Sequence, residues 1–204
     1  MLAYLIATIV SSLGILLYFV FEFSPEQRWT VFFLNKALAE AGMVVLGLSF
    51  LLGPISRLFA PLRKHLVLRR YFGLAGFILI VIHVGTSLMQ YMGRFPLTWY
   101  QEHLWGFLAG VAGLAIFLIL ALTSSAGAIQ KYGFPKWKTI QRFGYLALIL
   151  ALVHIAVAAQ SRWQQWLAGT VDMPSSFVVF AFGVIVLVAR FVTIFFPAPK
   201  KAKK

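Results

Sequence analysis

Six long apolar stretches divide the chain, and each approaches the roughly 20 residues that a helix needs to cross a bilayer. They predict spans at 2–21, 39–60, 71–92, 105–123, 143–160 and 176–197. The connecting segments are short and contain turn-forming glycine and proline, as in Gly53-Pro54. The pattern therefore predicts an all-α membrane protein, a bundle of six transmembrane helices that forms a single domain over residues 1–204.

The composition agrees with a chain that is solvated largely by lipid. Hydrophobic residues make up 61% of the 204 positions and charged residues only 11%, whereas about a quarter of a soluble domain is charged. The sequence contains no cysteine, which excludes disulfides, thiolate nucleophiles and cysteine-ligated iron–sulfur clusters. The four histidines are therefore the best candidate ligands for a metal or a haem.

Charged residues separate into two sets along the chain. The acidic set occupies alternate connecting segments and consists of Glu22, Glu26, Glu40, Glu102 and Asp172. The basic set occupies the other segments and the tail, with Arg57, Arg63, Lys64, Arg69, Arg70, Lys131, Lys136, Lys138, Arg142, Lys200, Lys201, Lys203 and Lys204. The positive-inside rule places the basic set and both termini in the cytoplasm, and Arg190 in the last span is expected to snorkel to that edge. The formal charge of +13 then reports topology, with anionic lipid and not nucleic acid as its partner.

Two histidines lie inside predicted spans, where an ionisable residue is costly and suggests a function. Phe72-Gly73 is followed by nine residues and His83, and Phe143-Gly144 is followed by nine residues and His154. Both spans start from the basic side, so a rise of 1.5 Å per residue puts each histidine about 15–20 Å beyond its basic flank. Two imidazoles at one depth on different helices suit the axial ligation of a haem.

Small or polar residues share the helix faces of these two histidines. Helical spacing puts Gly76, Ile80, Ser87 and Gln90 beside His83, and Ala147, Ala151 and Ala158 beside His154. Gly106, Gly110 and Gly113 form a similar face on the fourth span. Such faces permit the close approach of a flat cofactor or of another helix. The alternative to haem is therefore helix packing, with each histidine hydrogen-bonded inside the bundle.

The other two histidines lie near predicted span ends. His65 lies in a basic segment, and His103 lies at the start of the fourth span beside Glu102. We expect both to be interfacial residues and not ligands, although His103 is also placed to meet an external electron acceptor or a metal.

Several short stretches resemble the ferric-reductase-like transmembrane family. They are Gly53-Pro54-Ile55-Ser56-Arg57, residues 68–74 leading to His83, and Leu122-Thr123-Ser124-Ser125 followed by Trp137, Gln141, Tyr145 and His154. The likeness covers about residues 45–160 and is nearest to the MsrQ/YedZ-type haem-binding membrane subunits of bacteria. It implies a six-helix bundle in a bacterial inner membrane, related to the membrane domains of STEAP metalloreductases and NADPH oxidases.

The resemblance also implies how many haems the chain holds. The oxidases stack two haems, with an extra histidine nearer the cytoplasm on each ligand helix, where this chain has Arg69 or Arg70 and Gln141. One haem b is therefore expected, the outer one, with His83 and His154 as its axial ligands. The MsrQ/YedZ type usually has a histidine where Gln141 stands, and this chain departs from it there.

A second redox group is expected between the cytoplasm and the haem. We predict a flavin (FMN or FAD) or a quinol near Arg69, Arg70, Trp137, Lys138, Gln141 and Arg142. Basic groups suit a flavin phosphate, Trp137 offers a ring for stacking, and a flavin takes the place of the inner haem in the STEAP relatives. The alternative is that these bases only set topology. Arg94 and Arg162, just outside the haem depth, are expected to pair with haem propionates.

The sequence thus predicts a transmembrane b-type cytochrome. Electrons would pass from a cytoplasmic-side flavin or quinol through one bis-histidine haem to an acceptor at the outer face, with redox partners on both faces or within a larger complex. Bis-histidine ligation leaves the iron no open position, which favours electron transfer over oxygen activation. Two alternatives stay open: a one-haem metalloreductase that acts on metal chelates, and a non-redox accessory or scaffold subunit.

Overall fold

A computed structural model describes residues 1–22, 30–91 and 97–196, and these ranges contain helices joined by short turns, with no strand. In chain order they are α1 (Leu2–Glu22), α2 (Val31–Leu58), the 3-10 helix η1 (Ala60–His65), α3 (Leu68–Tyr91), α4 (Leu97–Glu102), α5 (Leu104–Leu122), α6 (Ala126–Tyr132), α7 (Phe134–Arg142), α8 (Gly144–Ala158), α9 (Gln160–Leu167) and α10 (Ser175–Phe195).

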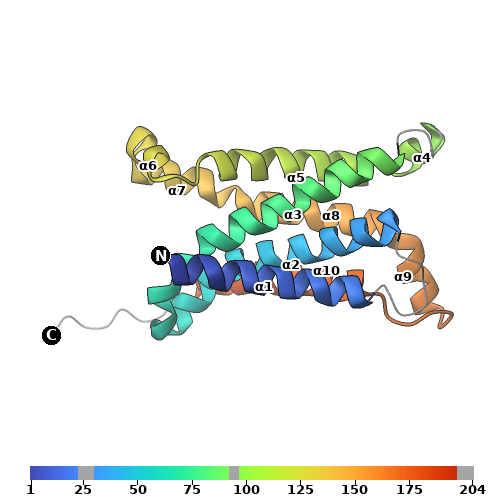
Figure 1. Cartoon of the computed structure of the whole chain (residues 1–204), viewed down its shortest axis with the longest axis horizontal. Helices are drawn as coiled ribbons and strands as arrows, with labels where there is room; N and C mark the ends of the chain where they lie inside the picture. Colours follow the sequence, from blue (N-terminus) through green and yellow to red (C-terminus); the bar gives the residue numbers. More distant parts are fainter. Residues whose placement is uncertain (23–29, 92–96, 197–204) are drawn as a thin grey trace.

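Six helical stretches in the described residues are long and apolar enough to cross a membrane. They are α1, α2, α3, α5, α7 with α8, and α10, which run side by side along an elongated bundle (Figure 1). The predicted all-α fold with six spans is therefore confirmed, and the chain is an integral membrane protein. The shortest predicted span, 143–160, is extended by α7, so that the whole stretch Phe134–Ala158 has 25 residues.

The second span begins earlier than predicted. Helix α2 starts at Val31, where the hydroxyl of Thr30 accepts a hydrogen bond from the Phe33 amide and caps the helix. Glu40 was assigned to a connecting segment, and that prediction was wrong: its side chain is buried within α2. Lys36 lies one turn earlier on the same helix face, with its Nζ 3.9 Å from Glu40 Oε1.

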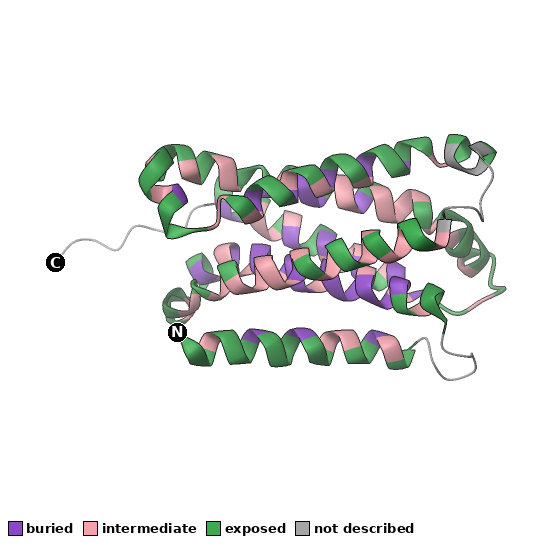
Figure 2. Ribbon diagram, turned by 45° about the horizontal axis from the view of Figure 1, so that its top comes forward, coloured by how far each residue is buried: buried purple, intermediate pink, exposed green. Residues whose placement is uncertain are grey.

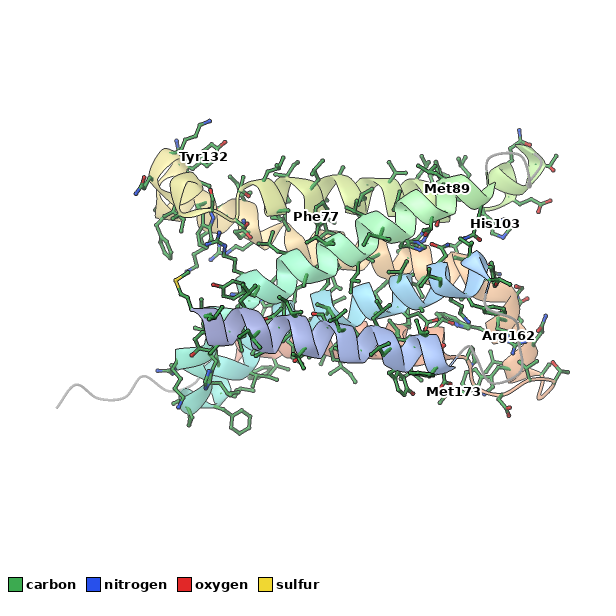
Figure 3. All side chains as sticks on the ribbon, in the orientation of Figure 1. Phe77, Met89, His103, Tyr132, Arg162 and Met173 are labelled. Carbon is green, nitrogen blue, oxygen red and sulfur yellow. The ribbon has the colours of Figure 1, made fainter. Side chains whose placement is uncertain are left out.

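The acidic side chains gather at one end of the bundle and most of the basic ones at the other. Helices η1, α6 and α7 lie at one end together with the start of α1, whereas α4 and α9 lie at the other end (Figure 1). The first, here called the basic end, holds Arg57, Arg63, Lys64, Arg69, Arg70, Lys131, Lys136, Lys138 and Arg142; the second, here called the acidic end, holds Glu22, Glu102 and Asp172. Figure 3 shows Tyr132 at the basic end and His103, Arg162 and Met173 at the acidic end. The predicted separation of acidic and basic segments is thus present in the fold. That the basic end faces the cytoplasm stays a prediction.

Helix α2 lies at the centre and contacts α1, α3, α8 and α10. Its buried residues pack with Phe117, Leu148 and Val179 from α5, α8 and α10. Figure 2 shows buried positions concentrated along the inner helix faces and exposed positions on the outward faces. Many of the outward residues are large and apolar, as expected where lipid replaces water.

Close packing of α2 against α3 depends on a glycine at position 76. A Cβ added there would lie 2.8 Å from the backbone nitrogen of Leu46 and 3.0 Å from the carbonyl oxygen of Gly42. Backbone atoms cannot move aside as the end of a flexible side chain can, so the two helices would have to separate.

We therefore predict that Gly76→Ala lowers the free energy of unfolding by about 1–3 kcal/mol, as expected for overpacking. Gly85→Ala on the same helix is the matched control, because a Cβ there would meet nothing within 4 Å. Both substitutions gain the same helix propensity, so the difference between them isolates the packing effect. Thermal unfolding in detergent would measure it, and equal melting temperatures for the two variants would contradict the prediction.

Candidate functional site

Two antiparallel helix pairs, α2 with α3 and α5 with α8, form an internal structural repeat. Helix α2 corresponds to α5, and α3 corresponds to α8, at an offset of 71 residues in the chain (154 − 83). The same offset relates Phe72-Gly73 to Phe143-Gly144. The residues where the helices cross are related by the same offset, Gly42 to Gly113 and Gly76 to Ala147. A Cβ at Gly76 of α3 would approach Gly42 of α2, and a Cβ at Gly113 of α5 would approach Ala147 of α8. The short sequence repeat before the two histidines therefore reflects two similar helix pairs.

Each intramembrane histidine donates to a backbone carbonyl of its partner helix. His83 Nδ1 lies 3.1 Å from the carbonyl oxygen of Asn35 on α2, and His154 Nδ1 lies 2.9 Å from that of Gly106 on α5. In both cases the carbonyl precedes the histidine by 48 residues. A carbonyl oxygen only accepts, so Nδ1 carries the proton and the lone pair of the neutral ring is on Nε2.

Both Nε2 atoms are left for another partner. Among the described residues, neither accepts or donates a hydrogen bond. A metal-bound histidine usually has this arrangement, with one nitrogen on the metal and the other N–H fixed by a carbonyl or carboxylate. The two rings thus share one arrangement, with Nδ1 fixed by a carbonyl and Nε2 without a hydrogen-bond partner among the described residues.

The glycine face of α5 packs on α8 and reaches one of the histidines. A Cβ at Gly106 would lie 2.7 Å from Val157, and one at Gly110 would lie 2.8 Å from Nδ1 of His154. The packing role expected for these glycines is confirmed. Gly110 in addition lets the His154 ring lie directly against α5.

The residues expected beside His83 face the neighbouring helix α2. The Ile80 side chain packs against Gly42 of α2, because a Cβ added at Gly42 would lie 2.8 Å from Ile80 Cδ1. Ser87 bonds to Asn35, and the Gln90 amide donates to the Val31 carbonyl at 2.9 Å. Of the two uses considered for this face, the structure therefore shows helix packing.

Asn35 is a site residue that sequence reasoning missed, because the predicted span began at residue 39. Its amide nitrogen donates to Ser87 Oγ at 3.0 Å, and its amide oxygen accepts from Thr86 Oγ1 at 2.6 Å. Thr86 Oγ1 is also 2.9 Å from the His83 carbonyl. This network fixes the backbone of Asn35 and hence the carbonyl that orients His83. No sequence signal marked it, because the 48-residue spacing that Asn35–His83 shares with Gly106–His154 appears only once the helices are paired.

The residues predicted for a flavin or quinol lie at the basic end, in two groups. Trp137 Nε1 donates to the Thr123 carbonyl at 2.9 Å, and Gln141 Nε2 donates to Thr123 Oγ1 at 3.1 Å, which ties α7 to the end of α5. Arg69 instead donates from Nε to the Ser49 carbonyl of α2 at 3.3 Å. The remaining three, Arg70, Lys138 and Arg142, are exposed.

The other predicted residues lie at the two ends of the bundle. Arg94 lies outside the described residues. Arg162 is exposed on α9. His65 Nδ1 lies 3.3 Å from the Tyr4 hydroxyl, which joins η1 to α1, and His103 is half-buried at the start of α5. These placements agree with interfacial roles for the two histidines.

Comparison with known proteins finds a matching family and a bacterial relative. A sequence profile described as "Ferric reductase like transmembrane component" matches residues 38–152, which include His83 and end two residues before His154. Over 52 residues the chain is 40% identical to the "Protein-methionine-sulfoxide reductase heme-binding subunit MsrQ" of Agrobacterium fabrum. This alignment covers 26% of the present chain and 24% of the relative, about a quarter of each.

We predict that Asn35→Ala destabilises the fold by about 1–3 kcal/mol, because it removes the partners of Thr86 and Ser87 inside the bundle. Ser11→Ala is a suitable control, since the Ser11 hydroxyl bonds only to the Ala7 carbonyl one turn away on an exposed face. Thermal unfolding in detergent measures both variants. A melting temperature of the Asn35 variant no lower than that of the control would show that the network is unimportant.

Proposed function

This chain belongs to the ferric reductase like transmembrane component family, and from that membership we propose that it is a transmembrane b-type cytochrome. One haem b, held by His83 and His154, would connect a flavin or quinol on the cytoplasmic side with an electron acceptor at the outer face. The observation that carries the proposal is the pair of Nδ1–H···O=C hydrogen bonds, which direct two Nε2 lone pairs away from their carbonyl partners. The printed name of the relative, a haem-binding subunit, supports it.

The residues at the site fit axial ligation. The carbonyls of Asn35 and Gly106 fix the ring tautomer and increase the basicity of Nε2. Gly110 leaves room for the His154 ring against α5. A haem bound by two imidazoles supplies one-electron transfer without an open position on iron. The chain itself contributes the orientation of the two ligands and an apolar, water-poor surrounding within the bundle.

The proposal includes a topology and partners. The basic end faces the cytoplasm of a bacterial inner membrane, following the positive-inside rule. Residues 1–204 form one domain with a haem-binding core at about 45–160, in agreement with the matched range 38–152. Redox partners act on both faces, and the relative's description as a subunit supports work within a larger complex. Arg94 and Arg162 would meet the haem propionates.

A flavin (FMN or FAD) or a quinol at the basic end is the second part of the proposal. Trp137 and Gln141 are held against the end of α5 and offer a ring surface and an amide. Arg69, Arg70, Lys138 and Arg142 supply positive charge for a phosphate.

A second candidate is a metalloreductase, in which ferric or cupric chelates are reduced directly at the outer face. The family description favours it, and so does the position of His103 at the acidic end. Reoxidation of the chemically reduced protein by added ferric chelate, fast in the wild type and slow in His103→Ala, would support this activity.

We expect the detergent-purified protein to show a b-type spectrum at about one haem per chain, because two axial ligands hold a single iron. His83→Ala and His154→Ala should each lose the haem while still eluting as folded protein. His65→Ala and His103→Ala are the matched controls and should keep it. Absorption spectra of the oxidised and reduced forms measure the outcome. A wild type that binds no haem when haem is supplied would leave the accessory or scaffold function in its place.

For the flavin, we predict that the purified protein releases FMN or FAD on denaturation, and that Trp137→Leu and Gln141→Leu retain markedly less. Lys136→Ala is the control, since it removes a charge from the same helix outside the predicted site. Flavin fluorescence of the released cofactor is the readout. If no flavin is retained and added flavin does not rebind, the flavin part of the proposal is wrong. Reduction of the haem by an added quinol then tests the quinol as the donor.

A further inference from the structure

Three arginines from three helices meet around one tyrosine at the basic end. They are Arg57 of α2, Arg69 of α3 and Arg190 of α10, here called the arginine cluster. Arg190 Cζ lies 5.1 Å from the centre of the Tyr145 ring. The Tyr145 hydroxyl donates to the Phe50 carbonyl of α2 at 3.4 Å, and the Arg69 guanidinium lies against Gly53 of the same helix. The cluster therefore joins four helices, because Tyr145 belongs to α8.

Packing and backbone hydrogen bonds hold the cluster in place. Arg57 Nη1 donates to the Thr193 carbonyl of α10 at 3.2 Å, and Arg69 Nε donates to the Ser49 carbonyl of α2 at 3.3 Å. A Cβ at Gly53 would lie 3.3 Å from Arg69 Cζ, so this guanidinium rests directly on α2. Arg57 follows Gly53 by one helical turn on the same face. These contacts bring the side chains together at a defined place, which free snorkelling to the membrane edge would not do.

The cluster has no carboxylate partner in the described part of the chain. The sequence contains five acidic residues, Glu22, Glu26, Glu40, Glu102 and Asp172. Glu26 lies outside the described residues, and the only ion pair between side chains in the described residues joins Glu40 to Lys36. Glu40 precedes Arg57 by 17 residues of helix α2 (57 − 40), about 25 Å along its axis.

Three like charges without a counter-ion repel one another, most strongly where water is scarce. Arg69 and Arg190 are half-buried. A guanidinium carries five N–H donors, and in the described structure Arg57 and Arg69 each use one of them on a carbonyl. The remaining donors and the shared charge suit a phosphate group, which arginine binds with paired, charge-assisted hydrogen bonds.

Exposed apolar residues next to the cluster indicate what carries the phosphate. Leu58 and Phe59 follow Arg57, and Phe191 and Phe195 lie on α10 beside Arg190; all four are exposed. At this end of the spanning helices they would face the acyl chains of one leaflet, while the arginines reach headgroup level.

We propose that the arginine cluster is a phosphate-binding site for the headgroup of an anionic phospholipid of the inner leaflet. The bound headgroup supplies the missing negative charge and draws α2, α3 and α10 together around Tyr145. A flavin phosphate shares this chemistry and is separated from the lipid by the experiment below. The site does not depend on the haem, so its failure and the failure of the cytochrome proposal are distinguishable.

The test measures thermal unfolding of the purified full chain in a neutral detergent. Phosphatidylglycerol should raise the melting temperature, because a ligand that binds only the folded state stabilises it, and phosphatidylcholine should not. In Arg69→Gln and Arg190→Gln the concentration of phosphatidylglycerol for half the effect should rise about fivefold, as expected when one cationic contact of about 1 kcal/mol is lost. Lys64→Gln and Lys136→Gln, at the same end but outside the cluster, should respond as the wild type does.

Parallel titrations identify the source of the phosphate. FMN, riboflavin and inorganic phosphate replace the lipid, and native mass spectrometry counts phospholipids retained per chain. Stabilisation by FMN but not by riboflavin, weakened in the cluster variants, would uphold the phosphate site and assign it to the flavin. Equal responses of cluster and control variants to every phosphate compound, with equal lipid retention, would overturn the proposal. The haem spectrum of each variant, recorded beside these data, reports on the cytochrome independently.

Discussion

The close approach of helices within each pair is the constraint on which the rest of this structure depends. Gly76 and Gly113 have no side chain at the crossings of α3 with α2 and of α5 with α8, and the partner backbone occupies the space. Only at such short separation can an imidazole on one helix reach a carbonyl that already belongs to the hydrogen-bond ladder of its neighbour. A carbonyl oxygen has two lone pairs and accepts this second bond without breaking the helix. The orientation of His83 and His154 is thus a consequence of glycine packing some turns away.

Lipid as a solvent explains how much of the fold the sequence reveals. A spanning segment must satisfy all its backbone groups within the helix and be apolar over its length, so six spans can be read from hydropathy alone. Hydropathy does not predict the first turns of helix α2, because Asn35, Lys36 and Glu40 are polar residues typical of loops. In the structure Asn35 bonds to Thr86 and Ser87, and Lys36 lies 3.9 Å from Glu40 one turn along the helix. Such partners lie on other helices or one turn away, and hydropathy does not report them.

The sequence likewise predicts some features of the candidate site and not others. The repeated Phe-Gly-x9-His pattern reveals the two histidines and their common depth, since that needs only the periodicity of one helix. The tautomer of each ring depends on a carbonyl 48 residues earlier, which only the folded pairing of helices brings into contact. The distribution of charge is also predicted only in part. The alternation of basic and acidic segments predicts two different ends of the bundle. It does not predict that Arg190 lies over the Tyr145 ring instead of extending alone to the membrane edge.

The two ends of the bundle are mechanically related because they share helices. The α2–α3 and α5–α8 pairs meet where the ring of Phe50 on α2 lies against Gly144 of α8, and the Tyr145 hydroxyl donates to the Phe50 carbonyl at 3.4 Å. This junction lies beside the arginine cluster, whereas the two histidines lie nearer the acidic end of the same helices. The ligand proposed for the cluster would therefore act at the junction where the two helix pairs meet.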